Sequence, residues 1–211
     1  EDLIKLVEID NKEYLYYKAI APNIAFIRAT TCDSEGYATF EDEVMYLDAL
    51  VIAQAVHNNG GIVMMQVQKM VKKATLHPKS VRIPGYLVDI VVIDPDQTQL
   101  YGGAPVNRFI SGDFVLDDSQ QTALPLNQRK LVARRALFEM RKGAVGNVGV
   151  GIADGIGLVA REEGCADDFI LTVETGPIGG ITSQGIAFGA NVNTRAILDM
   201  TSQFDFYHGG G

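Results

Sequence analysis

The sequence predicts an α/β protein in two parts joined by a linker. Apolar runs of strand length alternate with stretches of helical apolar spacing, first over residues 1–96 and again over 127–211. Between them, over 97–126, the periodicity fades into Gly, Pro, Asp, Ser and Gln, the composition of a connection between units. We therefore expect two separately built α/β regions in one chain.

The first part is expected to form a strand, a turn, a helix and two further strands. Apolar spacing predicts the strands and the helix over residues 24–31, 41–58, 61–70 and 86–94. In the turn after the first strand, Gly36 supplies a permissive backbone. Thr39, with Asp42 three positions later, resembles a capping box for the helix, and Gly60 stands where a C-terminal cap belongs.

The second part repeats the alternation with shorter elements. A basic amphipathic helix closed by Gly143, a glycine-interrupted strand, a short helix ending at Gly164 and a last strand are expected over 127–142, 144–151, 154–163 and 169–174. We expect the two strands to be parallel neighbours, with the short helix as their crossover. Their carboxyl ends then lie at one edge of the sheet, where open α/β sheets bind ligands.

Composition excludes several classes of protein. The 211 residues are 47% hydrophobic and carry 18 Lys and Arg against 26 Asp and Glu, a net charge of −8. Non-specific electrostatic binding to nucleic acid or to an anionic membrane is therefore not expected. Cys32 and Cys165 form no CxxC pair and the three histidines form no cluster, so we expect no metal site, and reduced thiols in a cytoplasm.

Neither a charged-then-apolar leader nor an uncharged apolar run of membrane-spanning length is recognisable, so secretion and a membrane span are not expected. The chain begins without Met on EDLIKLVEIDNKEY and stops within the string HGGG. We interpret it as an internal piece of a longer polypeptide.

Two glycine-rich loops follow the two strands of the second part. They are NVGVGIADGIG, residues 147–157, and ETGPIGG, residues 174–180. Glycines at such an edge let backbone N–H groups approach a phosphate or a developing oxyanion. A tight turn that needs glycine only for a positive φ explains the same pattern, so the residues alone leave both interpretations open.

Glu174 ends the last strand at the start of the second loop. Three roles are open for a carboxylate there: binding a sugar, capping the structure or reacting with a substrate. It stands about 20 residues after the first glycines, where a dinucleotide-binding fold places its ribose-binding acid. The fingerprint of that fold does not fit, because Asp154 stands where the third glycine is needed and Gly155 comes one position late. The other candidates, each with an ordinary structural explanation, are Ser183, His57, His77, Arg28 and Asp33.

Five strings, in order, resemble the motifs of one enzyme family. They are RATTCDSEGYATFEDE, LHPKSVRIPGYLVD, NVGVGIADGIG, VETGPIGG and QFDFYHGGG. Across essentially all 211 residues the chain resembles the family I coenzyme A-transferases, within them the bacterial propionate CoA-transferases and, closely, the acetate (short-chain acyl-CoA) type of enterobacteria. Five ordered motifs are far more specific than one glycine loop.

The resemblance implies a fold and a reaction. The fold comprises parts of two related open α/β domains, the end of the first over 1–96 and the start of the second over 127–211. The reaction is transfer of coenzyme A between a short-chain acyl-CoA and a carboxylic acid such as acetate, by a ping-pong mechanism through a glutamyl-CoA thioester. No metal or redox cofactor is implied, because coenzyme A is a substrate.

The resemblance also implies roles for individual residues. Glu174 matches the nucleophile of the family's E-[ST]-G motif. Segments that bind CoA or the oxyanion in the family are matched by Gly149, Gly151, Thr175, Gly176, Gly179, Gly180, Gly209, Gly210 and Gly211. A homo-oligomer is implied at full length. Since part of the CoA site lies outside this piece, we expect the isolated chain to lack turnover; a non-catalytic scaffold fragment is the alternative.

Overall fold

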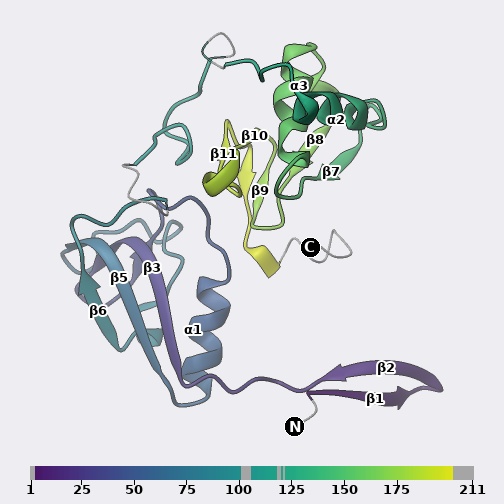
Figure 1. Cartoon of the computed structure of the whole chain (residues 1–211). Helices are drawn as coiled ribbons and strands as arrows, with labels where there is room; N and C mark the ends of the chain where they lie inside the picture. The colour runs from purple at the N-terminus through teal and green to yellow at the C-terminus, as the bar shows by residue number, and fades with distance from the viewer. Residues whose placement is uncertain (1–2, 101–105, 118–119, 121, 202–211) are drawn as a thin grey trace.

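The structure is a computed structural model that describes residues 3–100, 106–117, 120 and 122–201. Within these residues the chain forms two four-stranded sheets and two two-stranded sheets, with helices packed against the larger ones (Figure 1). The predicted α/β class is confirmed. The predicted site residues Gly209, Gly210 and Gly211 lie outside the described residues.

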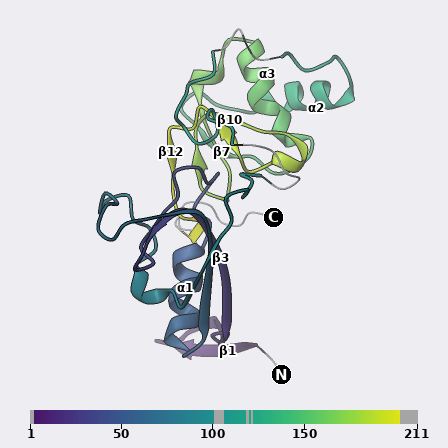
Figure 2. The ribbon, with the colours of Figure 1, turned by 90° about the vertical axis from the view of Figure 1, so that its left-hand side faces the viewer.

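The first large sheet is assembled around two long parallel strands, β3 (Ile24–Asp33) and β5 (Ile62–Val71). β6 (Ile90–Ile93) continues the parallel sheet beyond β5, and β4 (Ala38–Thr39) pairs antiparallel with β3. The spatial order is therefore β4-β3-β5-β6. The helix α1 (Ala49–Asn58) lies along one face of this sheet (Figures 1 and 2).

The core of this region lies between α1 and the sheet. Because side chains alternate between the two faces of a strand, every second residue of β3 and β5 points toward the helix. Ala25 and Ile27 of β3, with Met65 of β5, are buried there against Ala53 and Val56 of α1. Burial of this apolar set contributes most of the stabilisation of the region.

The opposite face of the same sheet is apolar and stays uncovered by the described residues. Parallel pairing places side by side on it Ile24, Phe26, Ile62, Met64, Ile90 and Val92. Phe26 is 79% exposed. Parallel strands carry near-continuous apolar sequences when their sheet is covered on both faces. The strands of this sheet have such sequences, which are typical of a sheet with both faces covered.

The helix of the first part is shorter than predicted, because α1 begins at Ala49 and the residues before it form turns and bends. The predicted capping box is wrong. Thr39 Oγ1 donates to Glu41 Oε2 at 2.6 Å, and the backbone N–H of Asp42 donates to Thr30 Oγ1 at 2.9 Å. These polar groups bind the end of β3 and its neighbours instead of capping a helix.

The last predicted strand of the first part is also shorter. Residues Gly85–Leu87 form a 3₁₀ helix, and only β6 is extended. A Cβ on Gly85 would lie 2.0 Å from the carbonyl oxygen of Glu35, so the backbone there is pressed against the turn after β3. This close approach bends the chain before the strand begins.

The second large sheet is built from short strands. Its members, in spatial order, are β12 (Ala196–Ile197), β9 (Pro177–Ile178), β8 (Ile170–Thr172) and β7 (Val145–Asn147). β7 and β8 are parallel, as predicted, and the other two pairs are antiparallel. A separate antiparallel pair is formed by β10 (Ile181–Thr182) and β11 (Asn191–Val192).

Two helices cover the second sheet, α2 (Gln128–Leu137) and the crossover helix α3 (Ile156–Glu162). They form a second core with β8, in which Ala133, Val159 and Leu171 are buried. Asn127 caps α2 by accepting a hydrogen bond from the backbone N–H of Lys130 at 3.1 Å. Figure 1 shows both helices beside β7 and β8.

Two predicted elements of this part end earlier than expected. The helix predicted over 127–142 ends at Leu137, where hydrogen bonds of the tighter i to i−3 type replace the α-helical ones, for example from Met140 N to the Leu137 carbonyl at 3.0 Å. The strand predicted over 144–151 ends at Asn147. The glycines that follow it leave the ladder and form a loop.

A β-hairpin projects from the first region (Figure 1). It comprises β1 (Ile4–Ile9) and β2 (Lys12–Tyr17). Asp10 and Asn11 make its two-residue turn with φ of 51° and 59°, the left-handed values that such hairpin turns require.

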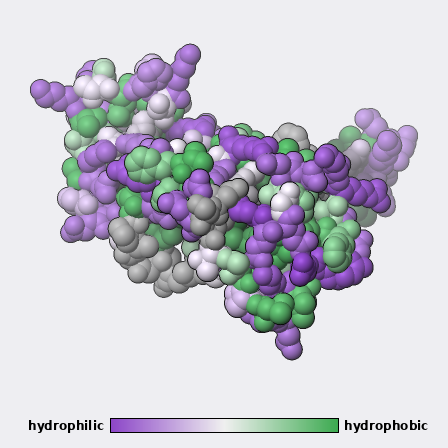
Figure 3. Space-filling model, turned by 90° about the horizontal axis from the view of Figure 1, so that it is seen from above, coloured by the Kyte–Doolittle hydropathy of each residue, from purple (hydrophilic) through white to green (hydrophobic). Residues whose placement is uncertain are grey.

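The two sheet regions meet through a small apolar cluster of Val44, Ile110 and Ala190. The side-chain amide of Asn193 also bonds both backbone groups of Leu116, at 2.8 and 2.9 Å, which ties the second region to the linker. In the view of Figure 3, hydrophilic residues cover most of the surface and apolar residues lie between them.

The uncovered apolar face of the first sheet predicts self-association of the isolated chain. Replacing Phe26 and Met64 together by Lys should weaken this association about tenfold or more, because two apolar contacts are lost and positive charges face each other. Sedimentation velocity over a concentration series measures it. Val51→Lys, on an exposed position of α1, is the matched control. Equal association of both variants would contradict the assignment of this face.

Candidate active site

Glu174 lies in the turn that follows β8, with Thr175 and Gly176. Val173, immediately before it, is fully buried, whereas Glu174 is half-buried. The turn is closed by a hydrogen bond from Gly176 N to the Val173 carbonyl at 3.0 Å. Among the described residues, the Glu174 carboxylate has no hydrogen-bond or ion-pair partner. The strand end therefore holds the backbone while the carboxylate stays available to a ligand.

The glycines after Glu174 have packing reasons to be glycine. Gly176 has a φ of 129°, and a Cβ there would lie 2.3 Å from the carbonyl oxygen of Leu198. Gly180 has a φ of 75°, and a Cβ there would lie 2.3 Å from the carbonyl oxygen of Val192. Gly179 has a φ of 72° and lies against the side chain of Arg195. The backbones of β11 and of the residue after β12 thus lie directly against the loop that carries Glu174.

The loop after β7 is different, because it is open. An added Cβ on Gly149 or on Gly151 would meet no atom within 4 Å, and Val150 between them is 71% exposed. Gly151 has a φ of 106°, so a glycine is required there for the backbone conformation. For Gly149 the described residues give no such reason. Open space beside bare backbone is what a ligand needs to approach the amides.

The parallel pairing of β7 and β8 places these two loops at the same end of the sheet. Asn147 pairs with Thr172, and Val148 N donates to the Thr172 carbonyl at 2.9 Å. Both strands end within a few residues of this contact. The structure therefore brings the Gly149–Gly151 loop and the Glu174 turn out at one edge, as the sequence predicts.

The loop between β10 and β11 contacts the Glu174 turn from a third direction. Thr175 Oγ1 donates a long hydrogen bond of 3.4 Å to the carbonyl of Gly189. A Cβ on Gly189 would lie 3.4 Å from Met45 Cε, which belongs to the first region. The Leu47 carbonyl accepts from Met200 N at 3.1 Å. The first-region segment that contains Met45 and Leu47 thus contacts segments next to the Glu174 turn.

A partly buried ion pair, with Glu43 as its buried member, fixes the segment of the first region that reaches this turn. Arg28 donates through Nε and Nη2 to Glu43 Oε2 at 2.9 and 2.7 Å, and Gln97 Nε2 donates to Glu43 Oε1 at 2.8 Å. Burial raises the pKa of Glu43, and the bonds from Arg28 and Gln97 offset this only in part. Arg28, a sequence candidate, is therefore a structural partner of Glu43.

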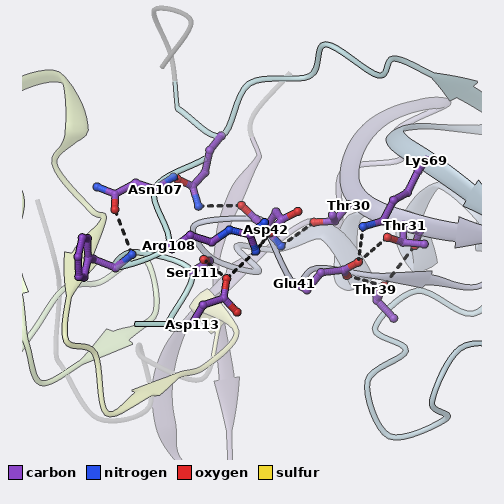
Figure 4. Close-up of polar contacts among 12 residues, drawn as sticks. Thr30, Thr31, Thr39, Glu41, Asp42, Lys69, Asn107, Arg108, Ser111 and Asp113 are labelled. Atoms are coloured by element: carbon purple, nitrogen blue, oxygen red, sulfur yellow. Dashed lines mark hydrogen bonds and ion pairs between the residues drawn. The ribbon is translucent and has the colours of Figure 1, made fainter. Parts of the chain in front are cut away.

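A second polar cluster lies at the end of β3 (Figure 4). Thr31 and Thr39 both donate to the Glu41 carboxylate, and Lys69 Nζ lies 3.7 Å from it. Burial acts to raise the pKa of Glu41, but the two hydroxyl bonds, a backbone bond and Lys69 together hold it below its usual value. No local pattern indicated this cluster, because Thr31 and Lys69 lie 10 and 28 positions from Glu41 along the chain.

Figure 4 also shows how the linker is attached to the first region. Arg108 pairs with Asp42 at 3.4 Å and with Asp113 at 2.8 Å, and Ser111 donates to Asp113 at 3.0 Å. Residues 108–113 of the linker are thereby held beside Asp42, in the segment that precedes α1. A cavity of about 620 Å³ lies here, lined by residues that include Arg82, Ser111 and Ile197 of β12.

The remaining sequence candidates have structural roles or no assigned one. Asp33 is buried and accepts backbone N–H groups of Glu35, Tyr37 and Ala74 at 2.9, 3.1 and 3.2 Å. His57 stacks edge-on with Tyr86. His77 lines the cavity beside Arg82 and accepts the backbone N–H of Lys79 on Nδ1 at 3.3 Å. The backbone N–H of Ser183 donates to the Ala190 carbonyl at 2.8 Å, at the end of the β10 and β11 pair.

Two features are absent from the part of the chain that is described. No group of three or more His, Cys, Asp or Glu side chains is arranged there to hold a metal ion. The described helices include none that is long and apolar enough to cross a membrane. Both cysteines are free, and Cys32 is fully buried, where burial and the nearby Asp33 charge raise the pKa of its thiol.

Comparison with known proteins confirms the resemblance that the motifs predict. Residues 1–94 match the family described as Coenzyme A transferase. The whole chain is 96% identical to acetate CoA-transferase YdiF of Escherichia coli K12, of which it covers 40%, and 40% identical to caffeate CoA-transferase of Acetobacterium woodii, of which it covers 41%. The chain thus spans about 40% of the length of these curated relatives.

Solved structures agree with this result. The crystal structure of acyl-CoA transferase YdiF from Escherichia coli O157:H7 in a thioester complex with CoA is 91% identical to this chain, with a TM-score of 0.89. The match covers 100% of this chain and 40% of that one. The apoenzyme structure of the same relative gives 92% identity and the same TM-score of 0.89.

The Glu41 cluster predicts acid sensitivity. A carboxyl whose folded pKa is lowered contributes stability above its unfolded pKa, about 4.3, and loses it as the pH falls through the folded value. The free energy of unfolding should therefore decline below about pH 4.3, and Glu41→Gln should flatten that decline while lowering stability at pH 7. Urea unfolding at several pH values measures both effects. Asp96→Asn, at an exposed position after β6, is the control and should change neither; an unchanged slope in Glu41→Gln would refute the assignment.

Proposed function

We propose that this chain is the nucleophile-bearing part of a CoA-transferase, which moves coenzyme A between a short-chain acyl-CoA and a carboxylic acid such as acetate. The observation that carries the proposal is the position of Glu174, a half-buried carboxylate without a protein partner among the described residues, at the sheet edge where two glycine loops meet. High identity to a relative named acetate CoA-transferase supports the substrate class. A solved relative in a thioester complex with CoA supports the intermediate.

The proposed reaction proceeds in two balanced halves. The Glu174 carboxylate attacks the thioester carbonyl of the acyl-CoA, and the C–S bond breaks. CoA departs as its thiolate, and the acyl group stays joined to Glu174 as a mixed anhydride. The thiolate then attacks the glutamyl carbonyl, the acid is released as its carboxylate, and Glu174 carries CoA as a thioester. A second carboxylate reverses these steps. Thioester energy is conserved, and the chemistry requires no metal or redox cofactor, since coenzyme A is itself a substrate.

Each step passes through a tetrahedral oxyanion, which needs hydrogen-bond donors placed in advance. We assign this work to backbone amides around Glu174. Gly149 and Gly151 are the best placed, because their loop is open and emerges beside the Glu174 turn. Thr175, Gly176, Gly179 and Gly180 would shape the turn and the CoA path. Gly209, Gly210 and Gly211 complete the proposed set, on the strength of the motif alone.

The same proposal includes the partners, the location and the assembly of the enzyme. Its partners are acyl-CoA and short-chain carboxylates, without nucleic acid or membrane, in a cytoplasmic homo-oligomer of the relatives' full length. Because this chain spans 40% of the relatives, the isolated 211 residues should lack turnover. Exchange of CoA from acetyl-CoA to propionate, measured on this chain beside the longer protein, separates an active core from a scaffold.

Glu174 is tested in a polypeptide of the relatives' length that carries this chain. Acyl-CoA without an acceptor acid should leave CoA on this side chain, and borohydride should then reduce the thioester and inactivate the enzyme. Glu174→Gln removes the anion and Glu174→Asp withdraws it by about 1.5 Å, so both should lose activity by at least about 100-fold while still folding. Steady-state kinetics should be ping-pong.

Peptide mapping distinguishes the proposal from its rival. A ribose-binding glutamate in a nicotinamide-dinucleotide fold would weaken binding on substitution and form no adduct. The peptide that contains VETGPIGG should therefore carry the modification in inactivated enzyme. Finding that peptide unmodified in enzyme inactivated by acyl-CoA and borohydride would reject the covalent role of Glu174.

A further inference from the structure

Asp154 is a buried acid at the end of the open glycine loop. Its side chain is 1% exposed, although it follows Gly149 and Gly151 by only a few residues and precedes α3. In the sequence it stands where a dinucleotide fingerprint would need its third glycine. A buried carboxylate is costly unless it is paired, so its presence needs a physical account.

The contacts of Asp154 tie together three segments of the second region. Its Oδ1 accepts from Gln184 Nε2 at 2.9 Å and from Arg129 Nη2 at 3.2 Å. The same Arg129 nitrogen donates to the carbonyl of Gly151 at 2.6 Å. Asp154 Oδ2 has no hydrogen-bond partner among the described residues. The side chain thus links the start of α2, the glycine loop and the loop between β10 and β11.

The bond from Arg129 sets the direction of a peptide in the glycine loop. In a trans peptide the C=O and the following N–H point in opposite directions. With the Gly151 carbonyl held toward Arg129, the N–H of Ile152 must point away from it. Gly151 has no side chain and a φ of 106°, so its own torsions resist rotation of this peptide little. The Asp154 and Arg129 pair supplies the constraint that the glycine lacks.

The link through Gln184 reaches the other loop of the candidate site. Gln184 and Gly189 both lie in the segment between β10 and β11. Asp154 holds one end of this segment through Gln184, and Thr175 contacts the other through Gly189. Both loops at the sheet edge, the open glycine loop and the Glu174 turn, are therefore fixed against one common segment.

We propose that Asp154 is a positioning residue, which acts through Arg129 and Gln184 to hold the Gly149–Gly151 loop in register with Glu174. The inference rests on the proposed function, because it concerns the same site. Its consequence is twofold. The loop amides stay directed at the reacting carbonyl, and the loop, which is open until CoA lies against it, then shields the glutamyl-CoA thioester from water together with the bound CoA. If water attacks that carbonyl, CoA thiol is released and the Glu174 carboxylate is regenerated without transfer.

A matched control exists on the same helix. Arg134 of α2 forms an ion pair with Glu163, at the end of α3, and so joins the two helices without touching the glycine loop. Like Arg129, Arg134 has a side chain about half exposed, at 48% against 53%. Loss of helix packing alone would affect both pairs, whereas loss of loop position would affect only the pair of Asp154.

The test compares Asp154→Asn and Arg129→Gln with Arg134→Gln in a polypeptide of the relatives' length. Acetyl-CoA is supplied with propionate, and propionyl-CoA formation and CoA release by hydrolysis are measured in the same sample. Their ratio does not depend on how much enzyme is folded. We expect transfer to fall about 10- to 100-fold and the ratio of hydrolysis to transfer to rise about tenfold, with both within about twofold in the control.

Hydrogen exchange supplies a readout that is independent of activity. Peptides over residues 148–155 should exchange faster in Asp154→Asn than in the wild type or the control. Unchanged exchange, or reduced transfer at an unchanged ratio, would overturn the inference while leaving the role of Glu174 intact. Absence of any glutamyl-CoA in the wild type would instead refute the proposed function, and with it a positioning role in this reaction, whatever the exchange shows.

Discussion

The pairing of β7 with β8 is the constraint on which the candidate site depends. Each strand has only three residues, yet their parallel register decides that the Gly149–Gly151 loop and the Glu174 turn leave the sheet at the same edge. A parallel pair requires a crossover, and α3 provides it while burying its apolar side against Leu171. A slip of one residue would turn Leu171 away from the helices and move Glu174 to the opposite face. The apolar core and the site are therefore set by the same few hydrogen bonds.

The two regions contact each other through segments that lie outside both large sheets. The apolar cluster of Val44, Ile110 and Ala190 brings the segment before α1, the linker and the loop before β11 together. The Arg28 and Glu43 pair holds the first of these segments in place. Met45 of the first region and Thr175 of the Glu174 turn both lie beside Gly189, so this loop residue is where the first region comes next to the candidate site.

Much of the fold could be predicted from the sequence, because periodicity and caps are local. The long strands around Ile24 and Ile62, the crossover after β7 and the position of Glu174 at a strand end all follow from short-range patterns. The helix start was wrong because Thr39 and Asp42 have the spacing of a capping box but find nearer partners in the folded chain, Glu41 and Thr30.

The network around the site could not be predicted in the same way. Arg129, Asp154 and Gln184 are separated by 25 and 30 residues, and no local pattern relates them. In the sequence, Asp154 was notable only because a charged residue stands where the dinucleotide-binding fingerprint would place a glycine. Similarly, the packing against Leu198 and Val192 explains Gly176 and Gly180, and only the folded backbone reveals it. Long-range pairing of this kind is decided by the topology.

The buried thiol of Cys32 gives the chain a built-in chemical probe. Thiol reagents react with the thiolate, which must be both formed and reachable. Cys32 lies inside the first sheet with its pKa raised, whereas Cys165 is partly accessible beside the end of α3. Alkylation of Cys165 therefore samples the surface of the second region, and alkylation of Cys32 proceeds only as fast as β3 opens. A single labelling time course thus times the opening of the first sheet separately from exposure of the second region near the end of α3.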